Sequence, residues 1–339
     1  MTEYRVPTMD EIRAVPWNGF TVASTFSGAG GSSLGYRMAG FRVLYANEFI
    51  EAARATYAAN KSSYTVLDHR DIREVRAGDI LDSIGLGVGE LDLFDGSPPC
   101  ASFSTSGTRE GGWGKVKDYS GKKQRTDDLF FEFARLLDGV QPRTFVAENV
   151  SGLVKGTAKG YFLNILAALK ACGPGYRVSA RVLDAQWLGV PQARQRLIFV
   201  GVRNDLGFEP VHPTPHKNWI RLDHILPHIR RVKVGGYANK WEKADRPNPT
   251  VMASDATSSP TAYLSSGGYV ELADGSRRKL TIDEVRLICS FPQDFVLTGD
   301  FAQQWERMGR AVPPLMMKSI ASTLAERVLL PAEVKRRAA

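Results

Sequence analysis

The chain has 339 residues, of which 43% are hydrophobic and 24% charged, and its formal net charge is +8. This composition excludes a fibrous or disordered chain, and the length allows one large domain with a smaller companion. The positive charge favours a polyanionic partner such as nucleic acid. Three cysteines without CxxC spacing and five histidines supply few metal ligands, so we expect no metal site and a reducing, cytoplasmic setting.

No stretch of the chain predicts a signal peptide or a membrane span. Residues 1–18 are polar and contain prolines, and no later apolar run reaches the roughly 20 residues that a spanning helix needs. We therefore expect a cytoplasmic protein with no membrane partner, associated with the nucleoid if its partner is DNA.

The first predicted unit is a strand, a glycine loop and a helix. Residues 20–26 alternate as in a β-strand, the loop covers 27–33, and a helical apolar pattern begins at Leu34. Glycines let the backbone approach a ligand closely, and a helix N-terminus offers N–H groups to an anion. Because the spacing is not GxGxxG, the loop alone predicts either a nucleotide-like ligand or a tight structural turn.

Carboxylates end the next two predicted strands. Residues 43–48 form a strand that ends in Glu48, about twenty residues after the glycine loop, where an acidic residue accepts hydrogen bonds from ribose hydroxyls. A solvated surface glutamate is the alternative. After a helix over 51–60 and a strand over 64–67, Asp71 and Ile72 are placed to contact an adenine ring.

The fourth predicted strand leads to a cysteine. The apolar residues Leu91, Leu93 and Phe94 suit a buried strand of a parallel sheet, and Pro98 and Pro99 fix the backbone just before Cys100. Such a turn sets the direction of the thiol. We interpret Cys100 as a nucleophile, with an ordinary buried cysteine as the alternative.

A long loop over residues 104–127 alternates glycines with lysines and arginines, among them Lys115 and Lys117. Loops of this length are either functional or disordered. Its charge predicts a flap that closes over a phosphate backbone, with a surface insertion as the alternative.

A second ionisable group reaches the same edge of the sheet. After a helix over 129–137, a strand over 143–147 ends at Glu148. A carboxyl group in a partly dry pocket has a raised pKa and can protonate a ring nitrogen during nucleophilic attack.

The next segment predicts a row of planar donors. Following a helix over 161–172, the stretches 176–183 and 196–202 are typical of paired strands. Between them, Gln192, Arg194 and Arg196 alternate, so they are expected on one face. Such donors suit phosphate or a base carbonyl, and surface ion pairs are the alternative.

Taken together, these motifs resemble those of DNA (cytosine-5) methyltransferases, in the same order along the chain. The resemblance covers residues 20–202 and 246–329, which is most of the sequence. The motifs that carry it occupy residues 26–31, 47–48, 71–72, 96–100, 148–150, 192–196 and 246–251.

The resemblance implies a doubly wound α/β sheet of the Rossmann-like, S-adenosylmethionine-dependent methyltransferase type. Residues 1–203 with 307–339 would form the catalytic and donor-binding domain, and 204–306 a small target-recognition domain. The implied donor is S-adenosyl-L-methionine without a metal, and the implied acceptor is a cytosine flipped out of double-stranded DNA. We expect a monomer, with a cognate restriction endonuclease as a candidate partner.

The family also implies roles for single residues. Cys100 would add to C6 of cytosine, Glu148 would hold N3 and the exocyclic amine, Arg196 would lie near O2, and Arg194 would contact phosphate. At the donor, Phe26 would stack on adenine, Glu48 would hold the ribose, Asp71 and Ile72 would contact adenine, Gly28, Gly30 and Gly31 would line the methionine portion, and Pro99 would back the pocket. The expected DNA-binding residues are Lys115, Lys117, Gln192, Tyr237, Asn239 and Lys240.

The sequence departs from the family in the length of its recognition region. Residues 203–245 form a short segment for this purpose. Within it, residues 234–241 combine glycines with Tyr237, Asn239 and Lys240, which can read base edges, and we expect a short recognition site of roughly two to four base pairs.

A second departure is Arg310, which stands where the family usually has Asn. Arg310 could turn to a phosphate or pair with a local carboxylate. Alternatively, a cation beside the methyl site would favour carboxy-S-adenosyl-L-methionine as donor, because Arg binds carboxylates in a bidentate fork. The enzyme would then be a carboxymethyltransferase that makes 5-carboxymethylcytosine.

Two further readings of the sequence stay open. A cytosine-5 methyltransferase acting on tRNA would share the catalytic residues, and an inactive DNA-binding regulator would keep the fold without the reaction. The presence of nucleophile, acid and donor residues together disfavours the regulator.

Overall fold

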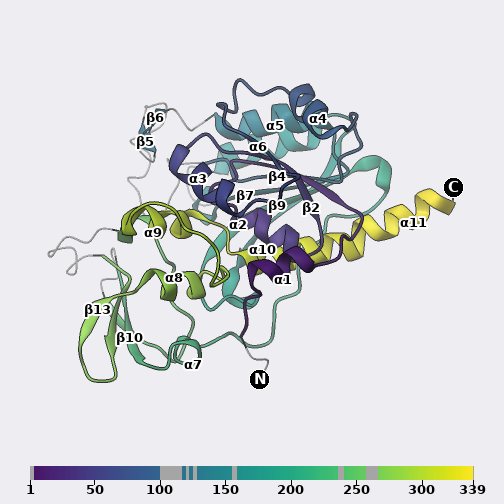
Figure 1. Ribbon diagram of the computed structural model, residues 1–339. Coiled ribbons are helices and arrows are strands. Elements are labelled where there is room, and N and C mark those ends of the chain that lie inside the picture. The colour runs from purple at the N-terminus through teal and green to yellow at the C-terminus, as the bar shows by residue number, and fades with distance from the viewer. Residues whose placement is uncertain are drawn as a thin grey trace.

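The computed structural model describes residues 4–99, 128–154, 159–235, 240–256 and 266–338, together with the backbone of 117–119 and 122–124. At its centre lies a seven-stranded sheet of order β3-β2-β1-β4-β7-β9-β8 (Figure 1). The neighbouring strands β3, β2, β1, β4 and β7 pair in parallel, whereas β9 runs antiparallel to both its neighbours, β7 and β8. This order confirms the predicted doubly wound α/β sheet. The strands are β1 (Thr21–Thr25), β2 (Arg42–Asn47), β3 (Val66–Asp68), β4 (Leu93–Gly96), β7 (Thr144–Val150), β8 (Tyr176–Asp184) and β9 (Gln195–Arg203).

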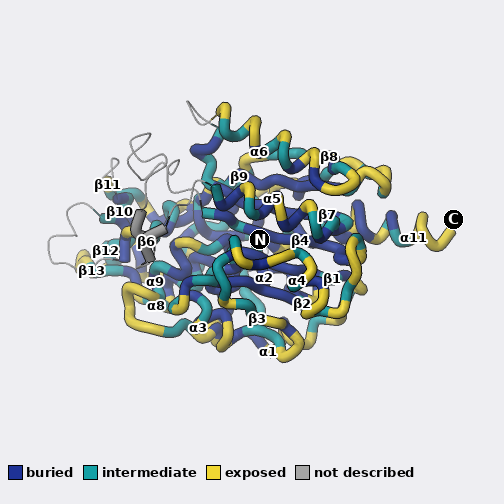
Figure 2. The backbone as a smooth tube through the Cα atoms, turned by 90° about the horizontal axis from the view of Figure 1, so that it is seen from above, coloured by how far each residue is buried: buried dark blue, intermediate teal, exposed yellow. Residues whose placement is uncertain are grey.

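Helices cover both faces of the large sheet, which explains its continuous apolar strands. In β7, Phe145 points into the core on one face and Val146 into the core on the other. Figure 1 shows α4, α5 and α6 on one side and α2 and α10 on the other. Figure 2 shows the buried strands between exposed outer segments. The helices are α2 (Gly31–Met38), α3 (Glu51–Asn60), α4 (Ala77–Ile84), α5 (Leu129–Val140), α6 (Lys159–Ala171) and α10 (Pro314–Leu324).

The strand order reverses between β1 and β4. Open α/β sheets bind ligands in the crevice at such a reversal, outside the carboxyl ends of the strands. Thr25 and Gly96 are paired at these ends. A Cβ on Gly96 would stand 2.5 Å from the Phe133 ring, so only glycine fits. The glycine loop after β1 and the proline turn after β4 therefore begin side by side.

A second, smaller body contains a four-stranded antiparallel sheet of order β11-β10-β12-β13. We call residues 222–310 the small lobe. Its core surrounds Trp305, and it also includes Met9 and Ile12 from the N-terminal helix. Its elements, with that helix, are α1 (Met9–Ala14), α7 (Leu222–Ile225), β10 (Ile229–Val234), β11 (Lys240–Lys243), β12 (Tyr269–Leu272), β13 (Arg277–Lys279), α8 (Ile282–Ile288) and α9 (Phe301–Arg310).

The division of the chain into two domains at 203/204 and 306/307 meets two complications. The second boundary falls within α9 (Phe301–Arg310), which belongs to the core of the small lobe. The predicted catalytic part also includes the N-terminal helix α1, whose buried side chains pack in that same core. The core of the small lobe therefore contains side chains of α1 as well as side chains of residues 222–310.

The C-terminal helix α11 (Leu330–Ala338) extends away from the body of the molecule (Figure 1). It continues from α10 through a π-helical segment, Ala325–Leu329.

The short strands β5 (Lys117–Tyr119) and β6 (Lys122–Gln124) pair antiparallel within the predicted flap. Among the described residues, no helix is long and apolar enough to span a membrane.

Candidate active site

Glu148 and Arg196 form an ion pair at the carboxyl edge of the large sheet, with 2.7 Å between Oε1 and Nε. Strand pairing causes this contact. Arg196 of β9 lies opposite Val150 of β7, and Glu148 is two residues before Val150, on the same face of that strand. Both side chains are largely buried, at 11% and 16% exposure. Burial lowers the pKa of Arg196, and the neighbouring Glu148 carboxylate opposes that change. The structure therefore brings together two of the residues that the sequence predicts for the base pocket.

The next residue on β7 connects Glu148 to the proline turn. Asn149 donates a hydrogen bond from Nδ2 to the carbonyl oxygen of Pro98, at 3.2 Å. Both groups are buried, so the bond is shielded from water. The turn that leads toward residue 100 is thus attached to the strand that carries Glu148.

Several predicted site residues lie outside the described part of the chain. Cys100, the flap beyond it and the Lys117 side chain fall there, and only the backbone of β5 and β6 is described in the flap. The other predicted residues outside the described ranges are Lys115, Tyr237 and Asn239. Lys240 is described; its side chain is 61% exposed and pairs with Glu242 at 2.7 Å.

The glycine loop follows β1 in an unusual backbone conformation. Phe26 has φ of 52°, a left-handed value that costs free energy in a residue with a side chain. Gly28 and Gly30 also have positive φ, at 56° and 93°, which glycine adopts without that cost. A Cβ on Gly28 would meet no atom within 4 Å, so the backbone there borders open space among the described residues.

Glu48 holds this loop from the end of β2. Its two carboxylate oxygens accept hydrogen bonds from the backbone N–H groups of Gly28 and Ile50, each at 2.7 Å. Burial raises the pKa of Glu48, while these hydrogen bonds and the charges of Arg307 and Arg54 oppose the rise. Each carboxylate oxygen keeps a second lone pair, so binding a ribose hydroxyl stays a prediction compatible with this geometry.

Asp71 and Ile72 follow β3 at the same edge of the sheet. Ile72 is 3% exposed and belongs to the core of the α4–α5 face. The Asp71 carboxylate accepts a hydrogen bond from the Arg73 backbone at 3.0 Å and pairs with its guanidinium. The predicted adenine contacts remain predictions for both residues.

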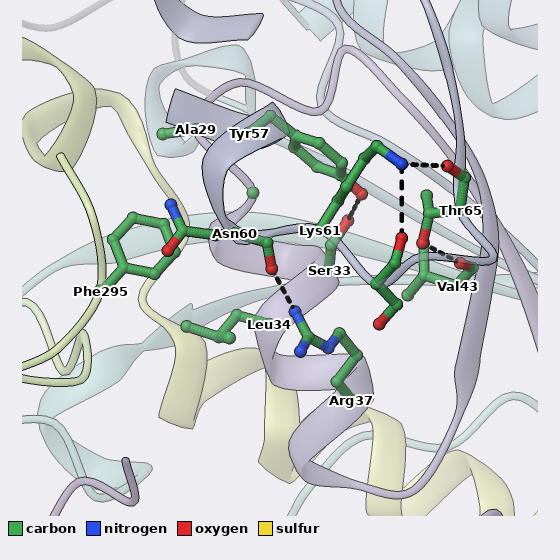
Figure 3. Close-up of a pocket in the computed structure, with 12 residues that line it drawn as sticks. Ala29, Ser33, Leu34, Arg37, Val43, Tyr57, Asn60, Lys61, Thr65 and Phe295 are labelled. Carbon is green, nitrogen blue, oxygen red and sulfur yellow. Dashed lines mark hydrogen bonds between the residues drawn. The ribbon is translucent and has the colours of Figure 1, made fainter. Parts of the chain in front are cut away.

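A small cavity of about 10 Å³ lies behind the glycine loop, between α2 and α3 (Figure 3). The Tyr57 ring lines it, and a Cβ on Gly30 would stand 3.0 Å from that ring. Tyr57 also donates a hydrogen bond to Ser33 at 2.9 Å, drawn in Figure 3. The cavity is far too small for a nucleoside, so we interpret its lining as support for the loop.

The row of donors predicted at 192–196 does not share one environment. Gln192 is fully buried, donates to Cys289 Sγ at 3.3 Å and accepts from Val251 N at 3.1 Å. Arg194 is 1% exposed and donates to the carbonyl oxygens of Val251 and Gly309, at 3.1 and 2.8 Å. Burial lowers the pKa of Arg194 to about 9. Gln192 and Arg194 therefore join the large sheet to the small lobe, and their predicted DNA contacts do not fit this burial.

Arg310 lies in the last turn of α9 and pairs with Glu306, with 2.7 Å between Nε and Oε1. This is the local carboxylate pairing that the sequence left open. The segment after it nevertheless lies against the glycine loop, since a Cβ on Gly31 would stand 2.4 Å from the Val312 carbonyl oxygen. Arg310 is thus near the loop, with its guanidinium engaged on the helix.

The sequence reasoning missed a buried carboxyl group, Asp95, in β4. It is 1% exposed and accepts hydrogen bonds from Ser24 at 2.7 Å and Tyr36 at 2.9 Å. Burial raises its pKa to about 7, the two hydrogen bonds lower it, and nearby Glu148 raises it. The available signal was an aspartate inside an otherwise apolar strand.

Among the described residues, no group of three His, Cys, Asp or Glu side chains could hold a metal.

Comparison with known proteins identifies the family of the chain. The profile of the C-5 cytosine-specific DNA methylase family matches residues 20–235 and 212–326. Type II methyltransferase M1.HphI of Haemophilus parahaemolyticus is 30% identical over 90% of this chain and 86% of its own. Type II methyltransferase M.NgoPII of Neisseria gonorrhoeae is 28% identical over 91% of this chain and 96% of its own.

Solved structures show the same fold. A DNA modification methyltransferase encoded within an E. coli prophage superposes with a TM-score of 0.67 at 19% identity, over 92% of this chain and all of the other. A DNMT2 mutant of Spodoptera frugiperda gives 0.65 at 17% identity, over 92% and 100%. With a family profile that matches most of its length, the chain belongs to the C-5 cytosine-specific DNA methylases.

Proposed function

We propose that this DNA cytosine-5 methyltransferase attacks C6 of a flipped-out cytosine with the thiolate of Cys100. The hydrogen bond from Asn149 to the carbonyl oxygen of Pro98 carries the proposal, because it ties the turn before Cys100 to the strand with Glu148. A nucleophile and an acid that act on one ring must both reach that ring, and the carboxyl ends of neighbouring parallel strands lie at one edge of a sheet. Here β4 and β7 are neighbours.

Covalent addition at C6 overcomes the weak nucleophilicity of C5. The thiolate forms a C6–S bond, the C5–C6 π electrons form a C4–C5 double bond, and the C4–N3 π electrons move to N3, which takes a proton from the Glu148 carboxyl group. C5 is then an enamine carbon that can attack an electrophile. After C5 is alkylated, loss of its proton re-forms the double bond and expels Cys100. Arg196, held 2.7 Å from Glu148, supplies the positive charge beside that carboxylate and would face the O2 side of the base.

Membership of the family implies S-adenosylmethionine as the donor, and the glycine loop fits it. The open space at Gly28 leaves room for a ligand against the backbone, and Glu48 is fixed at the loop's edge. When bound, S-adenosylmethionine supplies an electrophilic methyl group. The residues of this chain would orient it, with Phe26 at the adenine, Glu48 at the ribose and Pro99 behind the pocket.

A methyl group is the transferred group in this proposal. The carboxymethyl alternative rests on Arg310. The guanidinium of Arg310 already forms an ion pair with Glu306, with 2.7 Å between Nε and Oε1. Mass spectrometry of nucleosides from DNA incubated with each donor tests the choice. We expect 5-methylcytosine; 5-carboxymethylcytosine formed with carboxy-S-adenosylmethionine would establish the alternative.

Trapping on 5-fluorocytosine tests the nucleophile. Fluorine at C5 blocks proton loss, so the wild-type protein should stay covalently attached to duplex DNA that contains the analogue. Cys100→Ala should bind the duplex without forming the adduct. An adduct on tRNA and none on DNA would replace DNA with RNA as substrate, and an adduct formed by Cys100→Ala would remove Cys100 from the mechanism.

A further inference from the structure

Arg307 of α9 is a buried guanidinium group whose hydrogen bonds are incomplete. Its side chain is 5% exposed, and its Nε has no hydrogen-bond partner among the described residues. Its nearest carboxylate is the adjacent Glu306, with 3.4 Å between Nη2 and Oε2. Buried donors are nearly always paired in folded proteins, so an unpaired one beside a ligand site points to the ligand as its partner.

The position of Arg307 places it beside the glycine loop. Ala311 is the C-cap of α9, and its backbone N–H donates a hydrogen bond to the Arg307 carbonyl oxygen at 3.2 Å. Ala311 contacts the loop directly, since a Cβ on Gly31 would stand 3.1 Å from Ala311 Cβ. The positive charge of Arg307 also acts on Glu48, whose carboxylate holds Gly28.

We propose that Arg307 binds the α-carboxylate of the donor's amino-acid end. This inference rests on S-adenosylmethionine being the donor. That molecule carries a sulfonium, an ammonium and a single anionic group, and a guanidinium with a free N–H pairs with the anion. The alternative cation in the region, Arg310, is more exposed and bonded to Glu306.

The binding of two ligands without DNA provides the test. S-adenosylhomocysteine has the carboxylate, and its decarboxylated analogue keeps the ammonium, sulfur, ribose and adenine. Calorimetry should show that Arg307→Gln weakens S-adenosylhomocysteine roughly 10- to 100-fold, the usual range for a hydrogen bond to a charged group, and changes the analogue less than about threefold. Arg307→Lys should lose less than Arg307→Gln, because it keeps the charge.

Arg286→Gln is the matched control. Arg286 of α8 has a 14% exposed side chain and also has a buried Nε without a partner among the described residues. Its other bonds go to Asp283 and the Gln293 carbonyl. This variant should bind both ligands as the wild type does, and thermal unfolding of all three variants reports whether each is folded.

Three outcomes overturn the inference. Equal weakening of both ligands would show that Arg307 acts only by supporting the fold. Unchanged affinity of Arg307→Gln for S-adenosylhomocysteine would show that Arg307 does not contact the carboxylate. If the wild type binds neither S-adenosylhomocysteine nor S-adenosylmethionine, the donor assignment fails together with this inference, whereas a failure of 5-fluorocytosine trapping leaves it intact.

Discussion

Asn149 Nδ2 lies 3.2 Å from the carbonyl oxygen of Pro98, and both groups are buried. Asn149 also accepts a hydrogen bond from the Val150 backbone at 2.8 Å, which fixes its amide group. A contact between neighbouring strands thereby controls where the turn after β4 ends.

Asn149→Ala should reduce kcat at least tenfold while donor affinity stays unchanged. Loss of the bond leaves a buried carbonyl group unpaired, so the free energy of unfolding should fall by about 1–3 kcal/mol. Steady-state methylation and urea unfolding measure the two effects. Asn18→Ala is the control, because Asn18 Nδ2 donates to the Ala39 carbonyl away from the site and should affect stability alone. Unchanged kcat in Asn149→Ala would contradict the positioning role.

Glu148→Gln should reduce kcat by about 10²- to 10⁴-fold, the usual contribution of general acid catalysis. The amide keeps the shape of the side chain but cannot deliver the proton, and it ends the ion pair with Arg196. Single-turnover transfer at saturating donor isolates the chemical step. Activity within threefold of the wild type would remove Glu148 from the reaction.

Asp95→Asn should change how stability depends on pH. The pKa of Asp95 rises on folding from 3.8 to about 7, so between those values the folded chain keeps a proton that the unfolded chain has lost. The stability of the wild type should therefore fall as pH rises through this window, with a slope contribution of about 1.4 kcal/mol per pH unit at most, and level off above it. Urea unfolding from pH 4.5 to pH 8 measures the slope.

The variant should lack this slope, because an amide does not titrate there. Asp92→Asn is a useful comparison on the same segment, since Asp92 pairs with Arg143 at 2.9 Å and should cost stability across the range. Parallel stability curves for the wild type and Asp95→Asn would contradict the buried, proton-holding state.

Arg194 and Arg196 should respond differently to the same substitution. Arg194→Met leaves the Val251 and Gly309 carbonyl groups without their donor, and we expect a loss of about 2–5 kcal/mol in unfolding free energy. Arg196→Met should mainly lower kcat, because its partner is Glu148. Urea unfolding and methylation rates distinguish them, and the reverse pattern would exchange the two roles.

The large sheet was predictable because its signals are local. The predicted helix over 51–60 agrees with α3, and the stretches 176–183 and 196–202 agree with β8 and β9 within one residue or so at each end. A buried parallel strand shows as an apolar run wherever it occurs. The short helix α4 was missed, since its buried positions are few and Gly78 weakens its pattern.

The direction and partner of a polar side chain were less predictable. Alternation places Gln192, Arg194 and Arg196 on one side of an extended chain, but it does not say what covers that side. For Arg194 the covering groups lie 57 and 115 residues away in sequence. The partners of Asp95 are similarly remote, at separations of 71 and 59 residues.

The packing of α1 limits how the small lobe could be exchanged with that of a relative. Met9 N donates to both carboxylate oxygens of Asp294 at 3.0 Å, and Tyr4 donates to the Leu287 carbonyl at 2.7 Å. A chimaera that replaced residues 222–310 alone would leave these N-terminal groups facing foreign side chains. Grafts meant to transfer sequence preference should therefore carry residues 4–14 with the lobe, as two separate pieces of one recombined unit.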